Sequence, residues 1–243
     1  MLVLGLDCAT GVTAMAILDD QQVVAEMFLH IERPHSERLI PLLHQLLQSA
    51  GMTLEQMTAL AVSVGPGSFT GLRIGLATIK GLAHPLGLPV VGVSTLEALA
   101  GHGAPFAGLV CPVLDARKNE VYTCLYRSDG QGGPMERLVE EQAINPRDWL
   151  AILHSFEPEP VMFVGDAVTV YQEIWRELGP RAWLAPPEWR YPRGVLVARL
   201  GRAQYLQAAG DGRTLSPRYL RPSEAEVTWA KKHGQGLPKD GSA

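Results

Sequence analysis

Cysteine is scarce in this chain of 243 residues, which holds three, at positions 8, 111 and 124. An odd and widely spaced set forms neither a disulfide framework nor a Cys-x-x-Cys motif. Cys8 and Cys111 lie in apolar runs, where a buried thiol is the usual case. We therefore expect a reducing, cytoplasmic setting. The N-terminal residues carry no basic segment before the first acid, Asp7, and so do not resemble a secretory signal.

The sequence also lacks the common signatures of membrane spans, metal sites and hydrolases. Its long uncharged windows, such as 57–72, are interrupted by Gly, Pro, Ser and Thr, so no transmembrane helix is expected. The 7 histidines include no His-x-x-x-His pair, since His30 and His35 are five residues apart. A metal site is therefore not expected. No Gly-x-Ser-x-Gly nucleophile motif and no Walker A loop is present.

Charge is distributed unevenly along the chain. Residues 1–189 contain 11 Lys and Arg against 21 Asp and Glu, a net charge of −10, whereas residues 190–243 contain 10 against 4, a net charge of +6. The total of −4 argues against a general nucleic-acid-binding surface. The basic C-terminal quarter is explained either by a solvated helix and tail or by a local RNA contact, for which Lys231 and Lys232 are the candidates.

Short β-favouring runs alternate with amphipathic segments, which predicts an α/β protein. The expected strands are 2–7, 13–18, 23–29, 59–64, 89–93, 109–114, 120–127, 137–141 and 161–164. The expected helices are 34–50, about 69–86, a segment after the capping box at 94–97, 145–156, 168–178 and 193–209. Two successive sets of similar elements, separated by a hinge at 101–105, suggest a duplicated architecture.

The expected domains follow from this order. Residues 1–103 form a first lobe, which the helix at 193–209 completes, and residues 104–192 form a smaller second lobe. Residues 210–243 form an extended basic tail.

Three segments are candidates for anion or nucleotide binding. They are the Asp7–Gly11 turn after the first strand, the glycine-rich junction Gly65–Gly71, and the charged turn that begins at Asp115. Glycines and a helix N-terminus can offer backbone N–H groups to a phosphate, and strand-end carboxylates can hold Mg-phosphate. A hairpin turn or a tight strand-to-helix connection explains the same residues without a ligand. The cleft residues predicted on this basis are Asp7, Thr10, Gly65, Gly67, Ser68, Thr70 and Asp115.

Five motifs, in order from residue 2 to about 222, resemble the TsaB (YeaZ) family. They are Leu6-Asp7-Cys8-Ala9-Thr10, then 34–41 (PHSERLIP), 65–75 (GPGSFTGLRIG), 114–122 (LDARKNEVY) and 217–221 (PRYLR). The 65–75 block is long and specific. The resemblance implies an actin-like fold of two βββαβα-type lobes around a cleft.

The resemblance also implies a function. Members of this family are non-catalytic subunits in threonylcarbamoyladenosine synthesis at adenosine 37 of tRNAs that read codons beginning with A. They form a heterodimer with the catalytic paralogue TsaD, and the ATPase TsaE is a further component. TsaD binds metal through a His-x-x-x-His pair, of which only His35 is present in the matching stretch here. No cofactor is required on this basis, weak nucleotide binding stays open, and tRNA is expected to be bound mainly by the complex.

The resemblance places the partner interface on the first two helices, which would also serve a homodimer of the isolated chain. A buried interior helix would show the same wide apolar stripe as the first of them. The predicted interface residues are His35, Leu39, Leu42, Leu43, Leu46, Arg73, Leu76 and Lys80. Two other functions stay open: an independent actin-like ATPase or sugar kinase that uses Asp7 and Asp115, and a metallopeptidase, for which the ligand set is missing.

Overall fold

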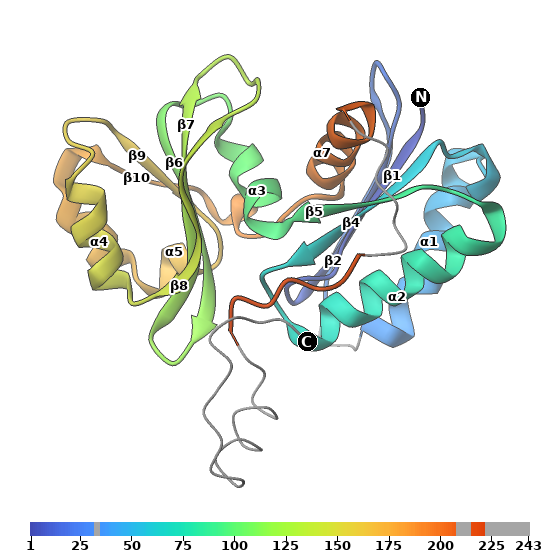
Figure 1. Cartoon of the computed structure of the whole chain (residues 1–243), viewed down its shortest axis with the longest axis horizontal. Helices are drawn as coiled ribbons and strands as arrows, with labels where there is room; N and C mark the ends of the chain where they lie inside the picture. Colours follow the sequence, from blue (N-terminus) through green and yellow to red (C-terminus); the bar gives the residue numbers. More distant parts are fainter. Residues whose placement is uncertain (32–34, 208–214, 222–243) are drawn as a thin grey trace, which may run out of the picture.

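The computed structural model describes residues 1–31, 35–207 and 215–221, and it shows two lobes side by side, each built on a five-stranded sheet (Figure 1). The first sheet has the order β3-β2-β1-β4-β5. β1 pairs antiparallel with β2 and parallel with β4, and β4 pairs parallel with β5. The strands are β1 (Val3–Asp7), β2 (Val12–Leu18), β3 (Val23–His30), β4 (Ala59–Gly65) and β5 (Val90–Ser94).

Helices cover both faces of the first sheet. α1 (His35–Ala50) and α2 (Phe69–Leu86) pack on one face, and α7 (Gly194–Gln207) packs on the other, against β1, β2 and β4. Gly5 permits the close approach of α7, because a Cβ at this position would overlap the backbone of Gly194 and Ala198. Because both faces of β1, β2 and β4 are covered, every residue of these strands is buried, including the polar Asp7, Thr13 and Ser63.

The second lobe repeats the arrangement with the sheet order β10-β9-β6-β7-β8. Its strands are β6 (Ala107–Arg117), β7 (Glu120–Asp129), β8 (Glu136–Ile144), β9 (Val161–Val164) and β10 (Ala182–Leu184). Its helices are α4 (Pro146–His154), α5 (Ala167–Val170) and α6 (Gln172–Trp175), and α3 (Thr95–Ala100) lies between the lobes (Figure 1). Mixed sheets with helices on their faces confirm the predicted α/β class.

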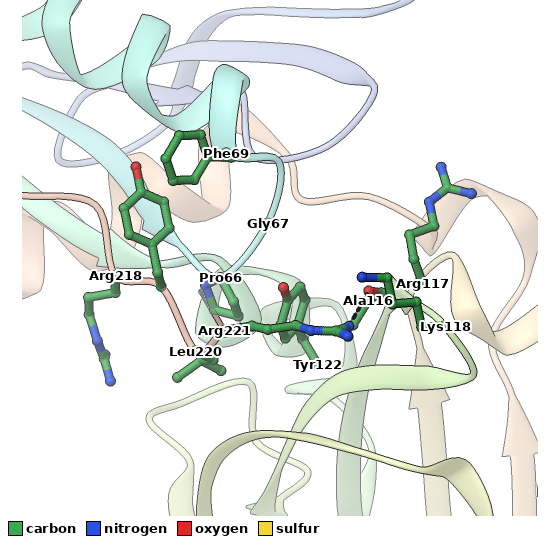
Figure 2. Close-up of a pocket in the computed structure, with 11 residues that line it drawn as sticks. Pro66, Gly67, Phe69, Ala116, Arg117, Lys118, Tyr122, Arg218, Leu220 and Arg221 are labelled. Atoms are coloured by element: carbon green, nitrogen blue, oxygen red, sulfur yellow. Dashed lines mark hydrogen bonds between the residues drawn. The ribbon is translucent and has the colours of Figure 1, made fainter. Parts of the chain in front are cut away.

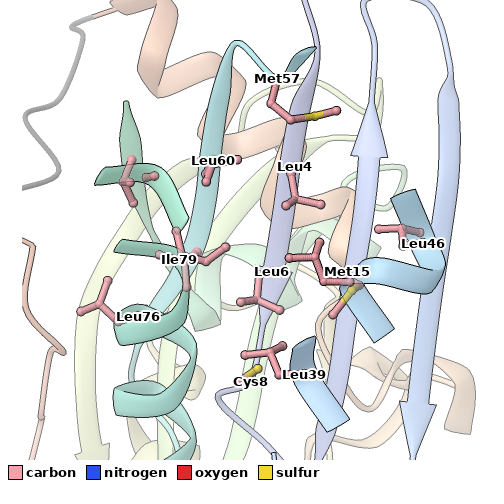
Figure 3. Packing of buried hydrophobic residues seen from close by; sticks show 14 of the residues in the cluster. Leu4, Leu6, Cys8, Met15, Leu39, Leu46, Met57, Leu60, Leu76 and Ile79 are labelled. Atoms are coloured by element: carbon pink, nitrogen blue, oxygen red, sulfur yellow. The ribbon is translucent and has the colours of Figure 1, made fainter. Parts of the chain in front are cut away.

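The core of the first lobe forms between α1, α2 and the sheet. α1 contributes Leu39, Leu43 and Leu46, which recur at helical spacing and contact residues of β1 and β2 such as Leu4 and Met15 (Figure 3). Gly51, at a φ of 63°, ends α1, as its position after the last apolar residue predicted.

The structure corrects the prediction of a single helix at 168–178. Tyr171 has φ −117° and ψ 25°, outside the helical region, and it separates α5 from α6. The apolar spacing of this segment is helical on both sides of the break, so periodicity alone did not reveal it. The three-residue edge strand β10 was not predicted either.

The chain returns to the first lobe through residues 185–193, where Arg193 makes a bidentate ion pair with Glu26 of β3, at 3.1 and 2.8 Å. None of the helices in the described ranges has the length and apolar character needed to cross a bilayer.

Candidate functional site

The glycine-rich segment Gly65–Gly71 packs directly against the β1–β2 turn. The Ser68 N–H donates to the Ala9 carbonyl oxygen at 2.6 Å. A Cβ on Gly67 would overlap the same carbonyl, and a Cβ on Gly71 would overlap the Cys8 carbonyl. The glycines are therefore needed for the close approach of two backbone segments, which is the tight-connection alternative that the sequence left open.

The N-terminus of α2 is closed by its own cap. Ser68 Oγ accepts from the Gly71 N–H at 3.2 Å, and the Ser68 carbonyl accepts from the Leu72 N–H at 2.9 Å. Ser68 and Thr70 are exposed, Gly67 is half-buried and Gly65 is buried. Thr10 is half-buried, and its Oγ1 accepts from the Val12 N–H at 3.3 Å, which is a turn contact.

Asp7, at the end of β1, is fully buried and is not among the described residues that line the pocket described below. Its relative exposure is 0%. Oδ1 accepts from the Ala9 N–H at 3.2 Å, while Oδ2 and the nearby Ser63 Oγ are buried without a hydrogen-bond partner. Burial raises the pKa of Asp7 to about 6, and the contacts with Ser63 and the Ala9 amide offset this only in part. The predicted role of Asp7 in an anion or nucleotide cleft stays a prediction.

His35 and Arg38 form hydrogen bonds that hold the start of α1 against the β1–β2 turn. Arg38 Nη2 donates to His35 Nδ1 at 3.1 Å and to the Gly11 carbonyl at 3.0 Å, and Nε donates to Thr13 Oγ1 at 2.9 Å. The Thr13 hydroxyl lies 2.8 Å from His35 Nδ1, and His35 Nε2 lies 2.9 Å from the Thr10 carbonyl. Because Nδ1 accepts, the proton of the neutral ring is on Nε2, which donates to Thr10. Burial lowers the pKa of His35, which agrees with a neutral ring.

Replacing Arg38 with Lys is expected to destabilise the chain by about 2–3 kcal/mol, because one ammonium group cannot replace a fork that contacts Thr13, Gly11, His35 and the Ile31 carbonyl. Arg147→Lys is the matched control, since that side chain is 67% exposed and has a single carboxylate partner. Urea unfolding measures both variants. If Arg38→Lys lowers the urea midpoint no more than Arg147→Lys does, the hydrogen bonds of Arg38 contribute nothing to stability.

Asp115 lies at the other predicted turn, near the end of β6. Its Oδ1 accepts from the Arg117 N–H at 2.9 Å, and its own N–H donates to Asp166 Oδ1 at 2.9 Å. Burial raises the pKa of Asp166. The turn itself is unusual, because Arg117, Lys118 and Asn119 all have a positive φ, at 63°, 55° and 59°. Asp7 and Asp115 therefore serve separate turns, and neither lines the pocket described below.

A C-terminal segment, residues 215–221, runs alongside α2 from Lys80 towards Phe69 and reaches the second lobe at Ala116. The Arg218 N–H donates to the Val64 carbonyl at 2.7 Å, and Lys80 Nζ donates to the Leu215 carbonyl at 2.9 Å. Arg73 Nε donates to the Tyr219 hydroxyl at 2.9 Å. Arg73 and Lys80, predicted as partner contacts, thus hold this segment.

Glu141 of β8 links both lobes to this segment, and the sequence did not single it out. The Ser94 hydroxyl, which caps α3, donates to Glu141 Oε1, and Arg218 Nη1 lies 3.5 Å from Oε2. The partners lie far from Glu141 in the chain, 47 positions before it in the case of Ser94, so no local pattern indicates the contact.

The segments around the lobe junction form a pocket of about 240 Å³. The glycine-rich loop provides one wall, the β6–β7 turn a second and the C-terminal segment a third (Figure 2). Figure 2 shows Arg221 reaching across the pocket to Ala116, whose carbonyl accepts from Nη1 at 3.4 Å. The lining residues are Pro66, Gly67, Phe69, Ala116, Arg117, Lys118, Tyr122, Arg218, Tyr219, Leu220 and Arg221.

Known proteins resemble the chain over nearly its whole length. A family model described as TsaD, tRNA N6-adenosine threonylcarbamoyltransferase, matches residues 23–229. A relative from Escherichia coli, tRNA threonylcarbamoyladenosine biosynthesis protein TsaB, is 40% identical over 97% of this chain and 100% of that protein. The chain belongs to the TsaB family. Among solved structures, YeaZ from Pseudomonas aeruginosa is 28% identical, with a TM-score of 0.74 over 90% of this chain and 99% of that one.

The TsaB-family chain has the actin-like fold that its motifs implied. A ROK hexokinase from Thermus thermophilus, 13% identical, superposes with a TM-score of 0.50 over 84% of this chain and 99% of the hexokinase chain. That likeness concerns the fold alone.

The structure corrects the predicted interface residues of this TsaB-family chain. Leu39, Leu43, Leu46 and Leu76 are 7% exposed or less and lie in the core of the first lobe, so their side chains do not form a surface. His35 and Leu42 are half-buried. The apolar row of α1 at 39, 43 and 46 packs inside the lobe, whereas Ile40, on the other side of the apolar stripe, is 50% exposed.

Proposed function

We propose that the chain is a non-catalytic subunit of the machinery that forms threonylcarbamoyladenosine at adenosine 37 of tRNAs reading codons that begin with A. It supports the transfer step of a TsaD-type paralogue. The full-length likeness to a protein named for this biosynthesis supports the pathway. The observation that carries the non-catalytic role is His35, whose two ring nitrogens are both engaged within the chain. In this arrangement neither ring nitrogen points to an open position where a metal ion could bind.

The described residues form no metal-binding cluster that would support the metallopeptidase alternative. Within residues 1–31, 35–207 and 215–221, no three His, Cys, Asp or Glu residues are grouped so that they could hold an ion.

Reconstitution tests the role directly. The TsaD-type transferase of the same organism, the adenylate donor and unmodified tRNA are incubated with and without the chain, and modified nucleoside is measured by mass spectrometry. We expect the modification to fall to background when the chain is left out. Full modification without the chain would reject the proposal.

The proposed partner surface is the outward side of α1 and α2. On α2, Arg73, Ala77 and Gly81 are exposed at a spacing of four residues, and the two small residues let another helix approach closely. On α1, Ile40 is 50% exposed. An exposed apolar side chain beside a stripe of small residues suits helix–helix docking, either with the paralogue or in a homodimer of the isolated chain.

Ile40→Glu and Ala77→Glu are expected to weaken binding to the TsaD-type paralogue by at least about 10-fold each, because both place a charge in the docking surface. Light scattering of the mixed proteins measures the complex, and TsaE is added in a second series as a further component. Val170→Glu is the matched control, since Val170 is 60% exposed on α5 of the other lobe.

An unchanged complex with both α1 and α2 variants would place the interface elsewhere. Leu43→Glu is unsuitable as a probe, because Leu43 is 7% exposed and a charge there would disrupt the core.

A further inference from the structure

The described lining of the pocket at the lobe junction is rich in cationic side chains, although the chain as a whole carries a net charge of −4. Among the eleven lining residues that the structure describes, four are cationic, namely Arg117, Lys118, Arg218 and Arg221, and none is acidic. The cations come from two segments far apart in the chain, so the fold gathers them. Lys231 and Lys232, the candidates that the sequence offered for RNA contact, lie outside the described residues.

Each of the three arginines lies near a carboxylate. Arg117 Nη1 lies 3.5 Å from Asp115, Arg218 Nη1 lies 3.5 Å from Glu141, and Arg221 Nη1 lies 2.9 Å from Glu120. The Arg117 side chain is still 86% exposed and that of Arg218 50% exposed. Both guanidinium groups thus keep exposed surface and donors that a ligand can use.

Aromatic rings are interleaved with these charges. Phe69 and Tyr219 stack with centroids 4.5 Å apart, and the Arg73 guanidinium lies 3.9 Å from the Phe69 centroid. Tyr122 lines the wall formed by the second lobe. Aromatic faces beside a basic groove are the usual platform for unstacked bases, with the cations contacting phosphates.

We propose that this basic pocket binds single-stranded RNA, with phosphates at Arg117, Lys118 and Arg218 and a base against the Phe69–Tyr219 pair. The inference rests on the proposed function, which makes tRNA the available RNA. An RNA strand is favoured over a free nucleotide because its successive phosphates and bases can reach the cations and rings that lie on different walls of the pocket. Among the described lining residues, no carboxylate is present to hold the Mg²⁺ of a nucleoside triphosphate.

The test compares two double variants with the same loss of charge. Arg117→Gln with Lys118→Gln removes two pocket cations, and Arg147→Gln with Arg176→Gln removes two arginines of the second lobe that are 67% and 59% exposed. Fluorescence anisotropy with a labelled, unmodified tRNA transcript measures affinity over a range of about 50 to 200 mM salt. The full chain is titrated alone and in complex with the paralogue.

We expect the pocket variant to bind tRNA about 10-fold more weakly, with the slope of log K against log salt reduced by about 1, as for one or two lost phosphate contacts. The control should keep the affinity and slope of the unaltered chain. Equal behaviour of the two double variants would overturn the proposal, as would undetectable tRNA binding by the chain together with unchanged binding by the complex.

Phe69→Leu separates stacking from charge. This variant keeps an apolar side chain at the start of α2 but removes the ring, so affinity should fall several-fold while the salt slope stays the same. Thermal unfolding checks that the fold is retained. If the Phe69→Leu variant binds tRNA with unchanged affinity, the Phe69–Tyr219 pair does not stack on a base.

Calorimetry with AMP tests whether the pocket binds a free nucleotide and not an RNA strand. Micromolar AMP binding that the pocket variant abolishes, with tRNA affinity unchanged, would assign the pocket to a free nucleotide and overturn the RNA proposal. Since reconstituted modification is measured separately, a chain that supports modification but shows no pocket effect would reject this inference and leave the proposed function intact.

Discussion

Asp7→Asn is expected to stabilise the chain by about 3 kcal/mol at pH 8 and by almost nothing at pH 4. The carboxyl group is fully buried, and its pKa is raised from 3.8 to about 6. Below pH 3.8 both the folded and the unfolded chain hold the proton. Between pH 3.8 and 6 the unfolded chain loses it while the folded chain keeps it, and above pH 6 the folded chain must carry a buried charge.

The stability that Asp7 contributes as a neutral acid is therefore present at low pH and lost as pH rises through about 6. Asn keeps an acceptor for the Ala9 N–H and adds a donor near Ser63 Oγ, which has no partner. Urea unfolding at intervals from pH 4 to pH 8 measures the difference between the Asp7→Asn variant and the unaltered chain. Asp129→Asn, at an exposed position, is the control. If the stability curves of the Asp7→Asn variant and the unaltered chain run parallel across this range, the Asp7 carboxylate does not cause the pH dependence of stability.

Gly71→Ala is expected to cost about 2–3 kcal/mol of stability, although alanine is the better helix former. Gly71 lies in the first turn of α2, and an added Cβ would overlap the Cys8 carbonyl at the end of β1. To relieve this overlap, the start of α2 must move away from the β1–β2 turn. The hydrogen bond from Ser68 to Ala9 would then lengthen or break.

Gly81→Ala in the same helix is the matched control. Gly81 is exposed, and no atom lies within 4 Å of the added Cβ. This variant should gain about 0.5–1 kcal/mol, because alanine loses less backbone entropy than glycine. Denaturant unfolding of both variants tests the opposite signs. A similar gain in both would show that the glycine-rich junction tolerates a side chain and that its packing is not tight.

Local patterns were sufficient for most of the fold. The apolar spacing of 39, 43 and 46 and the glycine at 51 placed α1, and the Ser94–Glu97 spacing placed the cap of α3, where Ser94 Oγ accepts from the Glu97 N–H at 3.1 Å. Patterns failed where the deciding contact was long-range. A wide apolar stripe looks the same whether it faces a sheet or a partner, so Leu39, Leu43 and Leu46 were assigned to the wrong environment.

The site was predictable in its segments but not in its geometry. The sequence located the turns at Asp7, Gly65 and Asp115, but it did not show that Asp7 is fully buried. The spacing of His35 and Arg38, three residues apart on one helix face, was a local signal that could have indicated a joint contact. Glu141 and Asp166 had no such signal, since their hydrogen-bond partners are 47 and 51 positions away.

The position of α7 has a consequence for folding during synthesis. The strands at the centre of the first sheet are made within the first 65 residues, whereas the helix that covers their second face begins at Gly194. The first lobe therefore emerges from the ribosome with one apolar face bare and stays so until the whole second lobe has been translated. The second lobe, whose elements are contiguous, can complete its core first, which reverses the usual order in which the N-terminal unit folds before the rest.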